Sequence, residues 1–160
     1  MLVQGALKAQ AGHVVFGWLF GVDIQIARAI RETNSGDVHI SSPARTRKQK
    51  MAIAYCAAGG PCAEAHYHEL MGRGNDSNFA QYCLWSDEDF RMLSVDAEVL
   101  DAMNNGYSLH IEQLLKRPDV QSAVTFISGV LYSQQTIAGN DAVALLKKLI
   151  PSRQKILGAH

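Results

Sequence analysis

The sequence predicts a mainly helical α+β domain with one small β-hairpin after the first helix. Helical patterns, in which apolar side chains recur every three or four residues, occupy most of the chain. Alternation of apolar and polar residues, which is typical of strands, is confined to a short region after the first helix. The 160 residues are 48% hydrophobic and 19% charged. This composition excludes a largely disordered chain, and the length fits a single domain over residues 1–160.

The first helix is expected over residues 2–20, because apolar side chains recur there at helical spacing. Gly12 and Gly17 each cost about 1 kcal/mol relative to alanine inside a helix, so we expect them to mark a close approach to the backbone. Alternating residues on either side of an Asn-Ser-Gly turn predict strands over 22–31 and 37–41.

A long second helix is expected over residues 45–70, with a bend where Gly59, Gly60 and Pro61 interrupt it. Cap residues and apolar spacing predict the later helices. They are expected from Asp76 or Ser77 to about Trp85, from Ser86 onward, over 96–115, from Pro118 to Tyr132, and from Asn140 to Lys148. The predicted core consists of apolar side chains on these elements. Its members are Val14, Val15, Trp18, Leu19, Ile53, Ala57, Phe79, Leu100, Leu114, Phe126 and Leu146.

Charge, hydropathy and cysteine usage narrow the class of protein. The chain carries 15 basic and 15 acidic side chains, and a net charge of zero argues against a nucleic-acid partner. It has no apolar run of about 18 residues and no phosphate-binding P-loop, so we expect no membrane insertion and no nucleotide. Cys56, Cys62 and Cys83 cannot all pair with one another, which indicates buried thiols and a cytoplasmic protein.

Three parts of the sequence carry side chains of the kind that bind metals. His13 stands alone on the apolar first helix. Glu64, His66 and His68 lie close together, although histidines two residues apart point in different directions on a helix. Asp76 precedes a predicted helix, where a carboxylate suits either a cap or a rigid metal ligand. From the residues alone, a buried histidine, a solvated helix end and a helix cap are the simpler interpretations.

Taken together, four segments resemble the zinc peptidase domain of the FtsH-type ATP-dependent proteases. Residues 7–19 resemble that family's metal-binding helix, which reads H-E-A-G-H followed by apolar residues and G-W-L. Residues 53–64 are similar to its G-G-x-x-A-E helix. Residues 74–80 resemble its S-N-D motif, and residues 131–139 resemble its L-L-x-x-E-T-L-x-G turn. Because the segments occur in the family's order, the resemblance implies the same helical fold over nearly the whole chain.

The departures from the family's motif fall on its reactive residues. In H-E-x-x-H, two histidines bind zinc and the glutamate takes a proton from the zinc-bound water. Here Ala9 occupies the position of the first histidine and Gln10 that of the general base, while His13 and Asp76 match the other two ligands. Alanine has no donor atom, and glutamine cannot accept that proton at neutral pH. The resemblance therefore implies that zinc is weakly bound or absent, and that catalysis is lost or severely impaired.

The function that this resemblance implies is a stand-alone FtsH-like metallopeptidase homologue with a degenerate active site, which binds protein or peptide. The family's ATPase module and membrane anchor do not occur in these residues, so a homo-oligomer or a separate ATPase is the expected assembly. One alternative is an active metal-dependent peptidase with rearranged ligands, in which His66, His68 or Glu64 joins His13 and Asp76. Another is a helical protein-interaction module without peptidase ancestry, which a large distance between His13 and Asp76 would indicate.

Overall fold

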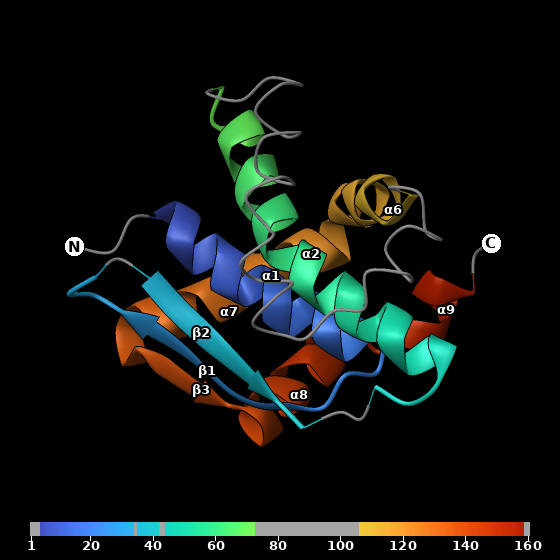
Figure 1. The fold of residues 1–160 in the computed structure, drawn as a ribbon. Helices are drawn as coiled ribbons and strands as arrows, with labels where there is room; N and C mark the ends of the chain where they lie inside the picture. Colours follow the sequence, from blue (N-terminus) through green and yellow to red (C-terminus); the bar gives the residue numbers. More distant parts are fainter. Residues whose placement is uncertain (1–3, 34, 42–43, 73–105, 159–160) are drawn as a thin grey trace.

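The computed structural model describes residues 4–33, 35–41, 44–72 and 106–158, and it is mainly helical with a small antiparallel sheet (Figure 1). The helices are α1 (Gln4–Leu19), α2 (Arg47–Leu70), α6 (Gly106–Leu115), α7 (Pro118–Gln134), α8 (Gly139–Leu149) and α9 (Arg153–Leu157). The strands are β1 (Ile24–Ile30), β2 (Ser35–Ile40) and β3 (Thr136–Ala138). This arrangement confirms the predicted fold class, including the hairpin after the first helix.

The sheet has the strand order β2-β1-β3, and β1 pairs with both neighbours in the antiparallel sense. β1 and β2 form the predicted hairpin, with a register shift between Ile24 and Ile26. β3 was not predicted, because three residues are too few to show an alternating pattern. It places Ile26 opposite Ala138, so the sheet joins the hairpin to the segment between α7 and α8.

α1 lies at the centre of the fold, where it contacts α2, α7, α8 and the sheet (Figure 1). Every residue from position 11 to position 19 is buried, so this part of the helix is covered on all sides. Gly21 follows the helix with a φ of 87°, a left-handed conformation that glycine adopts without steric cost. The predicted end of the first helix is therefore confirmed, and its last turns form the middle of the core.

α2 begins with a capping box that fixes its first turn. The Thr46 hydroxyl accepts a hydrogen bond from the Gln49 N–H at 3.1 Å, and the Gln49 side chain accepts one from the Thr46 N–H at 3.0 Å. The helix continues through Pro61, and its axis changes direction between its teal and green halves in Figure 1. Proline has no N–H to donate to the preceding turn, which explains the predicted bend.

Most of the predicted core that lies in the described ranges is confirmed. The buried members are Val14, Val15, Trp18, Leu19, Ile53, Ala57, Leu114 and Leu146. The prediction for Phe126 is wrong, because this side chain is 47% exposed. The buried positions of α7 follow a stripe that includes Val124, Ile127 and Leu131, and Phe126 lies beside that stripe.

Several predicted features lie outside the described residues. They are the core members Phe79 and Leu100, the candidate ligand Asp76, the helices expected from residues 76–77 and from Ser86, and the first part of the helix expected over 96–115. α6 corresponds to the end of that last helix, and α7 and α8 confirm the two that follow. α9 was not predicted. Across the described ranges, no helix has both the length and the apolar character that crossing a membrane requires.

Candidate functional site

α1 and α2 cross so closely that their backbones touch, at a point that we call the glycine crossing (Gly12, His13, Gly59 and Gly60). A Cβ atom added at Gly12 would overlap the Gly59 carbonyl oxygen. One added at Gly59 would lie 2.9 Å from the Gly12 carbonyl oxygen. Only glycine leaves room for such an approach. The close approach predicted from Gly12 is therefore confirmed, and it brings together two of the segments that resemble the peptidase family.

The imidazole of His13 lies buried in this crossing, with 4% of the residue exposed. Its Nδ1 atom is 2.8 Å from the Cys56 carbonyl oxygen, and the ring lies against the Cα of Gly60. A carbonyl oxygen only accepts, so Nδ1 carries the proton and donates it. Nε2 then carries the lone pair and faces Gly60, where an added Cβ would overlap it. Metal-binding histidines are held in this way, with the other ring N–H on a carbonyl or carboxylate.

Ala9 and Gln10 precede His13 on α1 and occupy the two positions that differ from the family's motif. Ala9 lies one helical turn before His13, but its methyl group has no lone pair to offer. The Gln10 side chain lies against Gly36 of β2, where an added Cβ would be 2.7 Å from the Gln10 Cγ. Its Oε1 atom is buried and has no hydrogen-bond partner among the described residues.

The fit of this site to a catalytic zinc ion follows from its donor atoms. Such an ion needs three protein ligands and a water molecule that a base can deprotonate. Ala9 supplies no ligand and Gln10 supplies no base. Within the described part of the chain, no group of three or more histidine, cysteine, aspartate or glutamate side chains is placed to hold a metal. Asp76 lies outside that part. The residues at the glycine crossing do not fit a catalytic zinc ion.

The candidate replacement ligands lie further along α2. Glu64 and His68 approach each other at 3.9 Å beside Gly5, at the opposite end of α1 from Gly17. His66 points elsewhere, as the two-residue spacing predicted, and its Nε2 lies 3.5 Å from the Gln121 amide nitrogen on α7. His66 is six positions after Gly60, which is about 9 Å along a helix axis. The described structure therefore does not bring these side chains together with the His13 ring.

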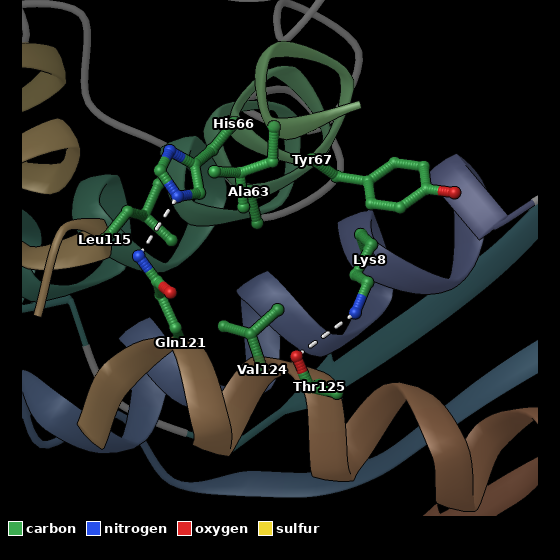
Figure 2. A pocket seen from close by; sticks show the side chains of 9 residues that line it. Lys8, Ala63, His66, Tyr67, Leu115, Gln121, Val124 and Thr125 are labelled. Atoms are coloured by element: carbon green, nitrogen blue, oxygen red, sulfur yellow. Dashed lines mark hydrogen bonds between the residues drawn. The ribbon is translucent and has the colours of Figure 1, made fainter. Parts of the chain in front are cut away.

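A second feature, which the sequence did not reveal, is a cavity of about 70 Å³ between α1, α2, α6 and α7. We call it the polar cavity. Figure 2 shows Lys8 and Thr125 on one side of it and His66 and Gln121 on the other. Its apolar walls include Ala63, Leu115 and Val124.

Two of its side chains are affected by burial. Burial lowers the pKa of the Lys8 ammonium from its usual value. Burial likewise lowers the pKa of His66, although the nearby Glu112 acts in the opposite direction. At neutral pH the imidazole of His66 is therefore uncharged in the folded protein. Lys8 supplies the positive charge of the cavity.

Part of this cavity had a signal in the sequence. Ala63, His66, Tyr67 and Leu70 follow the i, i+3, i+4, i+7 spacing of a single helix face. No spacing rule relates this face to Lys8.

No family model matches the chain, and no curated protein is significantly similar to it. Function is therefore inferred from the residues and their geometry.

Proposed function

We propose that this chain is a homologue of the FtsH-type zinc peptidase domain with a degenerate active site, and that it binds protein or peptide without efficient hydrolysis. The observation that carries the proposal is the orientation of His13. Its Nδ1–H is donated to the Cys56 carbonyl at 2.8 Å, in a crossing where Gly12 meets Gly59. Metal-binding histidines are held by a hydrogen bond of this kind, and a buried imidazole without a metal needs one as well. The orientation therefore fits the ancestry of a metal site, and the resembling segments and the zinc measurement below distinguish the two.

The packing of the resembling segments supports the same proposal. Residues 7–19 lie in α1 and residues 53–64 in α2, and these helices meet at the glycine crossing. Residues 131–139 form the end of α7, β3 and the start of α8, and β3 pairs with β1 directly after α1. Three segments separated in sequence are therefore parts of one compact arrangement around α1. The fourth, residues 74–80, lies outside the described residues.

The chemistry of positions 9 and 10 favours binding over hydrolysis. Loss of a general base alone typically reduces the rate of such a reaction by about 10²- to 10⁴-fold. Relative to the family's motif, Gln10 removes the general base, and Ala9 also removes a zinc ligand. Changes at these two positions alone would leave the rest of a polypeptide-binding surface as it is in the family, so protein or peptide is the partner we propose. Cys56 and Cys62 are buried and form no disulfide in the described part of the chain, which suits the cytoplasmic location that we also propose.

The test restores the two missing groups with the double substitution Ala9→His and Gln10→Glu. Zinc content is measured by mass spectrometry on protein without a histidine tag, and cleavage is measured on an unfolded substrate such as casein. We expect the repaired protein to hold about one zinc ion per chain, because a third ligand completes the site. Gln10→Glu alone is the matched control, since it adds the base without the ligand and is expected to leave zinc content unchanged.

Two results would overturn the proposal. A repaired and folded protein that binds no zinc would mean that the geometry of a metal site is absent, which favours a helical interaction module. Near-stoichiometric zinc in the unmodified protein would mean that other side chains complete the site, which favours a peptidase with rearranged ligands.

A further inference from the structure

The polar cavity lies away from the glycine crossing, and its polar side chains come from α1, α2 and α7. α7 contributes Gln121 and Thr125, which are four residues apart and therefore share a face. α2 contributes His66, and α1 contributes Lys8. Leu70 and Thr125 are exposed, so the cavity opens at the surface. Polar atoms from three separate helices thus line opposite sides of one small space, as Figure 2 shows.

Lys8 is a half-buried cation that lacks a counter-ion among the described residues. Its ammonium donates one hydrogen bond to the Thr125 hydroxyl at 3.3 Å and lies 5.7 Å from the centre of the Tyr67 ring. In the part of the chain that the structure describes, no carboxylate forms an ion pair with it. A charge removed from water is costly unless an opposite charge or hydrogen bonds compensate it. Two of the three ammonium protons remain available to an anion entering the cavity.

The other side of the cavity adds hydrogen bonding without adding charge. The Gln121 amide nitrogen lies 3.5 Å from His66 Nε2, and His66 Nδ1 is buried with no hydrogen-bond partner among the described residues. Glu112 on α6 and Lys116 just after it act on the pKa of His66 with opposite signs, so their charges partly offset each other there. The space therefore combines one positive charge with a hydroxyl, an amide and apolar walls. This combination suits a monoanion with a short apolar body, because burying the second charge of a phosphate among apolar groups would be costly.

We propose that the polar cavity binds a carboxylate carried on a short aliphatic body. The carboxylate accepts hydrogen bonds from the Lys8 ammonium and the Thr125 hydroxyl, while the aliphatic part lies against Ala63 and Val124. A cavity of roughly 150 Å³ holds a benzene molecule. At about half that volume, this one encloses a group the size of acetate, and the end of a propionate chain extends into the surface opening. The carboxylate belongs either to a free short-chain acid or to the C-terminal residue of a peptide.

The proposal does not depend on the proposed peptidase ancestry. Its test is calorimetric titration of the folded chain with propionate in a carboxylate-free buffer, with propionamide as the neutral ligand of the same shape. We expect a millimolar dissociation constant for propionate, as is usual for so small a ligand, and at least roughly tenfold weaker binding of propionamide. Inorganic phosphate is expected to bind less well than propionate. Equal binding of propionate and propionamide, or tighter binding of phosphate, would overturn the proposal on the unmodified protein.

Substitutions locate the ligand. Lys8→Met keeps the length of the side chain but removes its charge, and Thr125→Val keeps the shape but removes the hydroxyl. We expect Lys8→Met to weaken propionate binding by roughly 10- to 100-fold and Thr125→Val to weaken it by a smaller factor. Lys147→Met, at an exposed lysine on α8, is the matched control and is expected to change nothing. Unchanged binding in folded Lys8→Met would place the ligand elsewhere and contradict the proposal.

The two sources of the carboxylate are distinguished with short acetylated peptides that end in alanine, either as the free acid or as the amide. Tighter binding of the free-acid peptide than of propionate identifies a peptide C-terminus as the ligand. Binding of propionate with no binding of either peptide identifies a free short-chain acid. Equal binding of the acid and the amide would contradict carboxylate recognition altogether.

Discussion

The pair of helices α1 and α2 has two regions with opposite character. At the glycine crossing the two backbones touch, and the His13 side chain is buried with its Nδ1–H donated to a carbonyl at 2.8 Å. At the polar cavity the same helices separate enough to leave about 70 Å³, and a lysine faces that space with no carboxylate partner in the described structure. One region has no room for an added atom, and the other has room for a ligand.

The difference follows from the residues along α2. Gly59 and Gly60 at the crossing have no side chains, so α1 can approach to backbone contact. Further along, His66 and Tyr67 place larger side chains toward α1 and α7. Beyond the bend at Pro61, α2 therefore keeps α1 and α7 at a distance that side chains set. Small residues bring helices together into a rigid crossing, and bulky polar ones leave space that a ligand can use.

The largest expected effect is at the crossing, where Gly12→Ala adds a single methyl group. Its Cβ would overlap the Gly59 carbonyl oxygen, and a backbone atom of α2 cannot move aside without moving the helix. Overpacking of this kind costs about 1–3 kcal/mol, and the upper end applies because the obstacle is backbone. We expect the free energy of unfolding, measured by urea denaturation with circular dichroism, to fall by about 3 kcal/mol.

The matched control is Gly5→Ala on the same helix. An added Cβ at Gly5 would lie 2.8 Å from Glu64 Oε1 and 3.1 Å from His68 Nε2, which are the ends of flexible side chains. These can move, and alanine also favours the helix, so we expect a change within about 0.5 kcal/mol. If both substitutions cost the same, the two regions of the helix pair do not differ in the way described.

Much of the fold could be predicted from the sequence, because the patterns that indicate helices, strands and turns are local. The alternation of Val22, Ile24 and Ile26 marked the first strand, and Gly12 marked a close approach inside an otherwise apolar helix. β3 could not be predicted, because its residues become a strand only by pairing with β1. Phe126 was misplaced for a related reason: hydrophobicity identifies apolar residues, but the contacts of α7 decide which of them face inward.

In the candidate site, too, some features could be predicted from the sequence and others could not. His13 was identified by its position in a motif, and the divergence of His66 from His68 follows from helix periodicity. The orientation of the His13 ring requires the Cys56 carbonyl, which lies on another helix. Lys8 and Thr125 are 117 positions apart, and no pattern in the sequence links them. Spacing rules relate residues within one helix, whereas the polar cavity depends on how separate helices pack.

An intermediate effect is expected from removing a polar side chain at each region of α1. His13→Leu removes the hydrogen bond to the Cys56 carbonyl in a buried place, and we expect the free energy of unfolding to fall by about 1–2 kcal/mol. Lys8→Met removes a half-buried charge that has no ion pair in the described ranges, so we expect no loss and a gain below about 1 kcal/mol. Urea denaturation of both variants checks the signs. A larger loss for Lys8→Met than for His13→Leu would reverse the comparison.

The smallest expected effect is a pH dependence that originates at the polar cavity. Burial lowers the pKa of His66 in the folded chain, whereas the unfolded chain titrates near the ordinary value of about 6.5. Below that pH the unfolded state binds more protons than the folded state, so the free energy of unfolding falls as the pH falls. Above it the contribution of His66 to stability is fully present.

The variant His66→Gln isolates this contribution, because glutamine does not titrate in this range. Unfolding of the variant and of the unmodified protein is compared by urea denaturation between about pH 7.5 and about pH 5.5, the range in which histidine changes charge. We expect the unmodified protein to lose more stability than the variant over that interval. Glu112 opposes the shift and Lys116 reinforces it, so the difference is smaller than burial alone would give. Parallel pH profiles for the two proteins would mean that His66 is not held neutral by burial, and the contrast between the two regions would then rest on packing alone.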